Sequence, residues 1–469
     1  MLARGIPRPG RLLVLVLVIY GFMWIKGWPR YYDDEELPPS MRPQSGTALG
    51  PHGVGHDHLV VSIVTTATDV YTKLAPALAY LFDDDKDPTL IFSDLQMNVG
   101  DFPVFDVLFG YTRDFIGGNK ELERYRQQVN FARRSIPLGR LKKQDEHEEA
   151  EILAKLNKYK ILQAMARAWE YRPDRSWYAF VEDDTFVDRV NTLDWLAQYN
   201  PKTKWFFGNP PVSGVSDAFA AGGSSFILSA GAMKELFKER KNVIQNWEKQ
   251  IIEHTSAFDL VFSVLQAELN LSLTGAWPGI SGADPTSVPF SPAVWCERVM
   301  MMHHVSPDIW SDLYLLQKNH TEDHIRRPLL FADLWERFMA PEDLGSTRPD
   351  WDNLSSDPSN ARWNILFESD DPNDGHAPNG EDSPEACEAS CESSEYCMQW
   401  SYSSIPQKNW NENGQTKCHL SSSLRFGAYS PALEWNVNGV AKLRTWKSGW
   451  KKPRFLAWAN HQRCKNPAH

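Results

Sequence analysis

The segment that decides the fold is residues 177–187, which read WYAFVEDDTFV. Its first five residues, Trp177 to Val181, are aromatic, β-branched or small, which is typical of a buried strand. The strand runs directly into three acids, Glu182, Asp183 and Asp184. Residues i and i+2 of an extended chain point to the same side, so Glu182 and Asp184 can converge on one cation. A divalent cation held by one or two carboxylates keeps open positions for the oxygens of a diphosphate.

Outward from this segment, short apolar runs alternate with helical periodicity from His58 onward, which indicates an α/β layer fold. We expect strands at residues 59–64, 90–92, 177–181, 205–207 and 225–228, and helices at residues 72–82, 149–170, 230–240 and 256–269. The first three strands end at Thr65-Thr66, Ser93-Asp94 and the acidic triplet. Ligands of an open α/β sheet bind beyond the carboxyl ends of its parallel strands, so these ends predict one site. Each end alone also suits an ordinary turn or helix cap.

The composition bounds the class of protein. With 42% hydrophobic and 23% charged residues, the chain is neither disordered throughout nor a multi-span membrane protein. Its 469 residues allow two or three domains. Lys and Arg number 49 against 60 Asp and Glu, and the net charge of −11 argues against a nucleic acid as the main partner.

The N-terminus carries a membrane-targeting segment. Residues 12–25 are uncharged, and three arginines lie within residues 1–11 before them. The segment rises only about 21 Å as a helix, so a cleaved signal peptide is the alternative. No small-residue cleavage site follows, and Lys26 and Trp28 suit an interface, so we favour a retained anchor. The positive-inside rule then places residues 1–11 in the cytoplasm, and residues 26–56 form a lumenal stem.

The cysteines agree with a lumenal body. Five of the six lie in the C-terminal fifth of the chain, and an even number in an oxidising compartment suggests up to three disulfides. A zinc site is the alternative, but no CxxC pair supports it. Glycosylation sequons occur at Asn270, Asn319 and Asn353. Residues 57–345 are the expected catalytic domain, residues 346–384 a linker, and residues 385–469 a second, cysteine-rich domain with a tail.

Five segments in order resemble glycosyltransferase family 31, which includes Fringe and core 1 β-1,3-galactosyltransferase. They are VTTATD (64–69), LIFSD (90–94), WYAFVEDDTFV (177–187), FAAGGSSFILS (219–229) and MHHV (302–305). The resemblance covers about residues 57–330, and the sequence looks most like the fungal branch of the family. It implies a GT-A fold with a Rossmann-like sheet, a UDP-sugar donor, a glycan or glycoprotein acceptor, and inversion to a β-1,3 linkage. It also implies a single-pass type II protein of the Golgi membrane.

The same resemblance implies a Mn²⁺ site. Asp184 matches the principal metal-binding carboxylate, and Glu182 stands where the family usually has Asp. His303 aligns with the histidine that completes the metal shell, although its neighbour His304 could serve instead. Imidazole beside carboxylate oxygens favours Mn²⁺ over Mg²⁺ or Ca²⁺.

Donor-binding and catalytic residues also follow from the resemblance. The donor-binding set is Thr65, Thr66, Asp94, Asp183, Gly222 and Gly223. The glycines would let the backbone approach the substrate closely, although an ordinary turn is the alternative. Asp259 matches the acidic position expected to act as the general base, with Glu253 and Asp284 next in line. Because its neighbours are apolar, Asp259 could instead cap a helix or be a buried acid whose hydrogen bonds are all made within the protein.

The C-terminal cysteines resemble a PAN/apple-like module over about residues 385–445, through the spacing Cys387-x3-Cys391-x5-Cys397 and a later Cys418. Such modules bind protein or carbohydrate, although a structural appendage is as good an explanation. Cys464 lies beyond the module, and we hypothesise a pair with Cys296. An inverting transferase is therefore the first reading of the chain. A degenerate transferase that binds through this module is the alternative, and a two-carboxylate glycosidase is a third.

Overall fold

The computed structural model describes residues 58–81, 89–173, 175–209, 225–322, 327–342, 344, 347–356, 364–366, 380–405, 415–437 and 440–464. The expected anchor (12–25), the stem (26–56), most of the linker and the Gly222-Gly223 pair lie outside these residues. Within the described part of the chain, no helix has both the length and the apolar character needed to cross a membrane.

A mixed sheet in the order β3-β4-β2-β1-β5-β8-β7-β9 forms the centre of the N-terminal half. Its strands are β1 (Leu59–Val64), β2 (Thr89–Ser93), β3 (Met97–Val99), β4 (Phe102–Asp106), β5 (Trp177–Glu182), β7 (Phe206–Gly208), β8 (Phe226–Ser229) and β9 (Thr274–Gly275). Strands β4, β2, β1 and β5 run parallel, and β8 is antiparallel to β5. All five strands expected from the sequence are present, with ends within one residue of the prediction. The fold class is therefore confirmed as α/β with a central parallel sheet.

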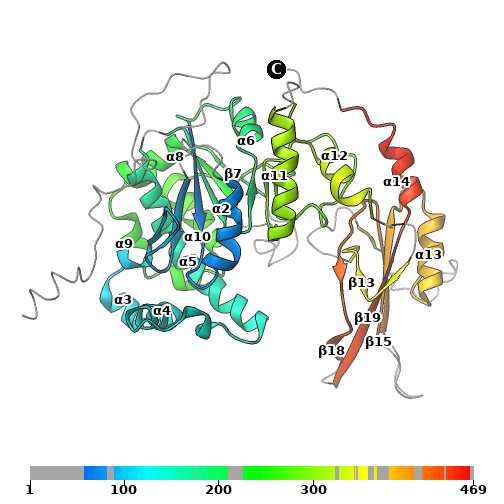
Figure 1. Ribbon diagram of the computed structural model, residues 1–469, viewed down its shortest axis with the longest axis horizontal. Helices are drawn as coiled ribbons and strands as arrows, with labels where there is room; N and C mark the ends of the chain where they lie inside the picture. The colour runs from blue at the N-terminus through cyan, green and yellow to red at the C-terminus, as the bar shows by residue number, and fades with distance from the viewer. Residues whose placement is uncertain are drawn as a thin grey trace, which may run out of the picture. The chain divides into compact units, whose positions relative to one another are not determined.

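The two faces of the sheet pack against different helices, because alternate strand residues point to opposite sides. Val60, Leu90 and Phe180 share one core with helices α5 (Glu146–Tyr171) and α10 (Ala257–Leu269), which also pack on each other. The intervening residues of β1, β2 and β5 face a second core with the π-helical turn η4 (Val70–Leu74) and helices α2 (Ala75–Leu81) and α6 (Arg189–Leu196). Figure 1 shows α2, α5 and α10 around these strands.

The expected helices are present with modified ends. α5 begins three residues early, since the Asp145 side chain caps it by accepting from the backbone N–H groups of His147 and Glu148. The helix expected at 230–240 is α8 (Ala230–Lys234) followed by the π-helical turn η8 (Glu235–Glu239). The remaining helices are α3 (Arg113–Gly118), α4 (Glu123–Arg133), α9 (Val243–Trp247), α11 (Pro307–Glu322), α12 (Phe331–Leu334), α13 (Pro384–Ser393) and α14 (Lys452–Ala459).

The C-terminal region is built around a second, antiparallel sheet. Its central strands are β19 (Val440–Trp450), β15 (Gln399–Ile405) and β16 (Gln415–Ser421), and α13 packs on β15 (Figure 1). The shorter strands are β12 (Arg348–Pro349), β13 (Trp351–Asp352), β14 (Asn364–Leu366), β17 (Ala428–Tyr429) and β18 (Leu433–Val437). Disulfides join Cys387 to Cys418 and Cys391 to Cys397, so the first of them fastens α13 to β16.

The third disulfide joins Cys296 to Cys464, which confirms the hypothesised pair. It lies beside a hydrophobic core that crosses the expected domain boundary. Trp295 and Trp335, from the N-terminal side, pack on Phe455 of α14, with ring centroids 5.9 and 4.4 Å away. The linker at residues 346–384 stays a prediction, but apolar packing joins the regions on either side of it.

One sequon cannot serve in the folded protein. Asn353 is fully buried, and its side-chain N–H groups donate to the carbonyls of Trp400 (3.0 Å) and Gly449 (3.3 Å). Its Oδ1 accepts from the hydroxyl of Ser355 at 2.7 Å. Asn353 is therefore a structural amide rather than a glycan acceptor, because the sequence pattern carries no information on burial. Asn270 and Asn319 are exposed.

Candidate metal and nucleotide site

The site forms where the order of the central sheet reverses. From β1 the chain passes to β2 on one side and later to β5 on the other, so a crevice opens at the carboxyl ends of β1 and β5. Val64 of β1 is in register with Glu182 of β5, which brings the two strand ends together. The hydroxyl of Thr65 donates to Oδ2 of Asp183 at 2.6 Å. The topology therefore joins the first and third polar strand ends that the sequence singled out.

A small three-stranded sheet, which the sequence did not predict, brings the late histidines to the acids. It consists of β6 (Phe186–Val187), β11 (Met301–Met302) and β10 (Ile280–Ser281). Met302 pairs with Phe186, and the Val305 N–H donates to the Asp184 carbonyl at 2.9 Å. His303 is consequently held beside the acidic triplet although more than a hundred residues separate them in the sequence.

Three side chains converge closely. Nε2 of His303 lies 2.9 Å from Oε2 of Glu182 and 2.9 Å from Oδ1 of Asp184. His304 is more remote, with Nδ1 3.7 Å from Oδ2 of Asp184, and 62% of its side chain is exposed against 6% for His303. One ligand atom each from Asp184, His303 and His304 lie within 4.8 Å of one another.

The electrostatics of the cluster follow from these contacts. Burial alone would raise the pKa of Asp184, but His303 and His304 outweigh burial and hold it well below its usual range. Burial alone would lower the pKa of His303, but Asp184 and Glu182 raise it to about 10. Burial raises the pKa of Asp183 to about 7, although Thr65 and Lys73 act in the opposite direction. Without a metal ion, the imidazolium of His303 thus offsets part of the negative charge of Glu182 and Asp184.

The residues of the cluster fit a divalent cation. Nδ1 of His303 is buried and has no hydrogen-bond partner within the described part of the chain. Two carboxylates with one or two imidazoles form a mixed oxygen and nitrogen donor set, which transition metals accept more readily than Mg²⁺ or Ca²⁺ do. The cluster is consistent with a divalent-metal site in which Asp184 and His303 are ligands and Glu182 or His304 is a third.

A hollow of about 190 Å³ adjoins the cluster. It is lined by Lys73, Asp183, Asp184, His304, Val305, Ser306, Pro307 and Trp310. Two acids, a histidine and a lysine in one lining suit a ligand that combines a metal ion with an anionic group.

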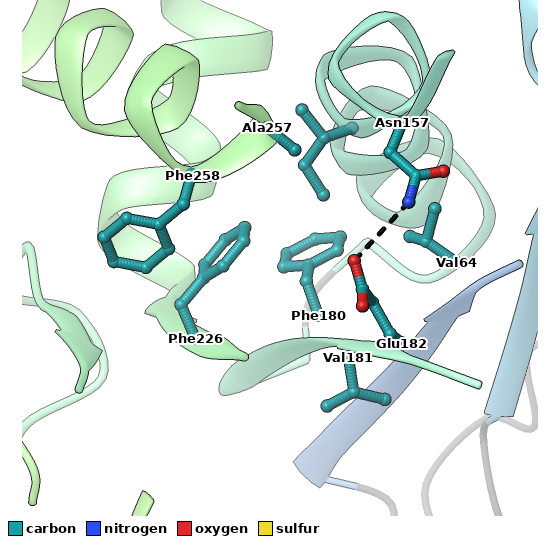
Figure 2. Close-up of a pocket in the computed structure, with 9 residues that line it drawn as sticks. Val64, Asn157, Phe180, Val181, Glu182, Phe226, Ala257 and Phe258 are labelled. Carbon is teal, nitrogen blue, oxygen red and sulfur yellow. Dashed lines mark hydrogen bonds between the residues drawn. The ribbon is translucent and has the colours of Figure 1, made fainter. Parts of the chain in front are cut away.

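A second, smaller pocket lies on the other side of Glu182, between β5, α5 and α10. Figure 2 shows the apolar walls of this pocket, among them Phe180, Phe226 and Phe258, with the Glu182 carboxylate and the Asn157 amide at its edge. The Asn157 amide donates to Oε1 of Glu182 at 3.5 Å (Figure 2). Glu182 therefore contacts His303 with one oxygen and Asn157 with the other.

Thr66 lies in the loop that follows β1, and Asp94 packs against this loop. Asp94 is fully buried, and its Oδ1 accepts from the Ala67 N–H (2.7 Å) and from the Gln128 amide (3.2 Å). Its Oδ2 lies 3.7 Å from the ammonium of Lys160, which is also fully buried. These contacts fix the loop that carries Thr65 and Thr66. Direct contact of Asp94 with a ligand stays a prediction.

Asp259 lies in the first turn of α10, where the Ser256 hydroxyl accepts from its backbone N–H. Oδ2 of its carboxylate accepts from the N–H and hydroxyl of Thr255 (3.0 and 3.3 Å) and lies 3.2 Å from Nδ1 of His254. Phe258, which precedes Asp259, lines the same small pocket as Glu182. The start of α10 is thus brought to the site, while the catalytic role of Asp259 stays a prediction.

The two alternative acids are placed differently. Oδ1 of Asp284 accepts from the N–H and hydroxyl of Thr286 and from the N–H of Ser287, so this carboxylate holds a turn. Glu253 is exposed in the short 3-10 turn before α10.

Sequence reasoning missed Lys73 and Asn157. Both lie on helical segments next to the strand ends, Lys73 in η4 after β1 and Asn157 in α5. For Lys73, the available signal was a polar side chain in the helical segment directly after β1.

No protein-family model matches the sequence. Among solved structures, the chain is similar to the galactosyltransferase LgtC, crystallised in complex with donor and acceptor sugar analogues. The identity is 10%, the match covers 54% of this chain and 95% of that chain, and the TM-score is 0.27.

Proposed function

We propose that this protein is an inverting, metal-dependent glycosyltransferase of the GT-A type. It moves a sugar from a UDP-sugar to a hydroxyl of a glycan or glycoprotein and forms a β-1,3 linkage. The observation that carries the proposal is the convergence of Glu182, Asp184 and His303 at the reversal point of a parallel sheet, next to a hollow of about 190 Å³. The resemblance to glycosyltransferase family 31 supports the choice of reaction.

In this mechanism Asp184 and His303 hold the metal ion, with Glu182 or His304 as a further ligand, and Mn²⁺ is the ion we propose. When bound, the metal supplies charge stabilisation to the departing diphosphate. Asp183, held by Thr65, faces the hollow beside Asp184 and contributes to donor binding.

We propose Asp259 as the base that takes the proton of the acceptor hydroxyl. His254 and Thr255 orient its Oδ2, and Oδ1 makes none of these contacts, which leaves Oδ1 to accept the proton. Asp259→Asn keeps the shape but removes proton acceptance, so turnover should fall roughly 10²- to 10⁴-fold, with donor and metal affinity nearly unchanged. Glu253→Gln is the matched control and should leave turnover unchanged. If Asp259→Asn instead weakens donor binding or unfolds the protein, the acid is structural.

The experiment that tests the function is a donor panel. Purified protein is incubated with Mn²⁺ and a series of nucleotide sugars, and release of the nucleoside diphosphate is followed with and without EDTA. We expect metal-dependent release from one UDP-sugar and none with Asp184→Ala. Binding of UDP and Mn²⁺ without turnover of any donor would support the binding-protein alternative. Turnover that EDTA and Asp184→Ala both spare would refute the metal site.

We also propose a location for the protein: a single-pass type II anchor at residues 12–25 in the Golgi membrane, with the body in the lumen. The three disulfides of the body support an oxidising compartment. Protease added to sealed microsomes should then spare the body, and its digestion would contradict this topology. The PAN/apple-like identity of residues 385–445 belongs to the same proposal, with a glycan or protein as the ligand of that module.

A further inference from the structure

Lys73 is a cationic residue in the lining of the larger hollow, which the acidic strand ends also line. It lies in η4, directly after the loop that follows β1, and lines the hollow together with Asp183, Asp184 and His304. About half of its side chain (48%) is exposed, so the ammonium is able to move. Burial alone would lower the pKa of Lys73, but Asp183, Asp184 and Asp69 outweigh burial and raise it.

The contact that Lys73 makes in this structure is a loose one. Its Nζ lies 3.7 Å from Oδ2 of Asp69, which is beyond hydrogen-bond distance. Oδ1 of the same carboxylate lies 2.7 Å from Nζ of Lys142, a much closer pair. Asp69 therefore keeps a cationic partner when Lys73 leaves it.

A nucleoside diphosphate bound to a metal at Asp184 and His303 would bring anionic oxygens into the hollow that Lys73 also lines. Those oxygens would offer the ammonium a stronger partner than the shared Asp69, because charge-assisted hydrogen bonds to phosphate are short and strong. The exchange leaves no buried carboxylate unpaired, since Lys142 stays on Asp69.

We propose that Lys73 binds the diphosphate of the nucleotide donor, exchanging Asp69 for the diphosphate while Lys142 holds Asp69. This inference rests on the proposed function. In the reaction, the bond from the anomeric carbon to the diphosphate oxygen breaks and its electron pair stays on that oxygen. The acceptor oxygen forms the new bond to carbon and loses its proton to the base. Lys73 adds positive charge where this negative charge develops.

The test measures nucleotide binding, which does not need turnover. Isothermal titration calorimetry with Mn²⁺ present compares UDP, UMP and uridine for wild-type protein and Lys73→Met. We expect Lys73→Met to weaken UDP binding about 10- to 100-fold, the range for a hydrogen bond to a charged group. The loss should be smaller for UMP and absent for uridine. Lys73→Arg, which keeps the charge, should recover most of the UDP affinity.

Two further lysines sharpen the comparison. Lys143→Met removes the same charge from an exposed side chain that pairs with Glu148, and it should leave UDP affinity unchanged. Lys142→Met removes the closer partner of Asp69, so Lys73 must break its own pair with Asp69 to reach the diphosphate. This variant should therefore weaken UDP binding by up to about 5-fold, the value of one surface ion pair.

The outcomes distinguish failure of this inference from failure of the proposed transferase function. Equal UDP affinity in wild type and Lys73→Met overturns the inference and leaves the transferase intact. The same loss in Lys73→Met and Lys143→Met also overturns it, because a general charge effect would then explain both. If wild-type protein binds no UDP with Mn²⁺, the proposed function fails, and the inference fails with it. Circular dichroism of each variant confirms that the fold is kept.

Discussion

Replacing His303 by Ala tests which histidine completes the metal site. The buried imidazole lies 2.9 Å from carboxylate oxygens of both Glu182 and Asp184, whereas His304 is 62% exposed and 3.7 Å from Asp184. We therefore expect His303→Ala to abolish Mn²⁺-dependent nucleotide binding. His304→Ala should reduce it only slightly.

The metal-free protein gives a second, independent readout. His303→Ala leaves two carboxylates together without their cation, and breaking a buried pair costs about 3–5 kcal/mol. The side chains of Asp184 and Glu182 keep 19% and 29% exposure, so water solvates them in part. We therefore expect the free energy of unfolding to fall by about 3 kcal/mol, the lower end of that range. His304→Ala, which breaks an exposed pair, should lower it by about 1 kcal/mol or less.

Urea unfolding in EDTA measures the free energy of unfolding of the metal-free protein, and Mn²⁺ titration calorimetry measures metal affinity. Equal effects of the two variants on both quantities would refute the assignment of His303. A His303→Ala protein that is as stable as wild type without metal would refute the argument from the ion pair. Loss of metal affinity in His304→Ala alone would make the exposed histidine the ligand.

Three further outcomes are expected. Burial raises the pKa of Asp188 to about 6, so the folded state holds its proton more tightly and stability falls as pH rises from about 4 to 6. In urea unfolding, the free energy of unfolding of wild type should fall by about 3 kcal/mol over this range relative to Asp188→Asn, because a pKa difference of one unit between the folded and unfolded states corresponds to 1.36 kcal/mol and the difference here is about two. Parallel pH profiles of the two proteins would contradict this. Replacing Cys296 and Cys464 together by Ala opens a loop spanning 168 residues and should lower the free energy of unfolding by about 5 kcal/mol, and an unchanged urea midpoint would show that the disulfide is dispensable. Mass spectrometry of the secretory-pathway protein should find glycan at the exposed Asn270 and none at the buried Asn353, where any occupancy would disprove its burial.

Local pattern was enough to predict five of the eight strands of the central sheet. The run at 177–181 and, apart from Ser62, the run at 59–64 consist of apolar or aromatic residues because both faces of these strands are covered by helices, and such runs are legible without tertiary information. The polar strand ends at Thr65 and Glu182 were legible because the apolar runs stop there. The resemblance to a known family then singled out His303, which no local pattern marks.

What local pattern could not predict are features that depend on pairing at long range. Strands β6, β10 and β11 have two residues each, too short for any periodicity, yet their pairing carries His303 to Asp184. Lys73 and Asn157 read as ordinary polar helix residues until the fold places one beside the hollow and the other on Glu182.

Burial decided the role of Asn353. Asn353 matches a glycosylation pattern, but the C-terminal sheet encloses it, and only tertiary structure determines whether an amide meets solvent or two backbone carbonyls. The sequence by itself determined the class of the central sheet and the acids at its edge. The hydrophobic effect requires a buried strand to consist of consecutive apolar residues, and such a run is visible in the sequence. Tertiary structure alone brought Lys73 and Asn157 to the site, because their positions depend on how separate segments of the chain pack together.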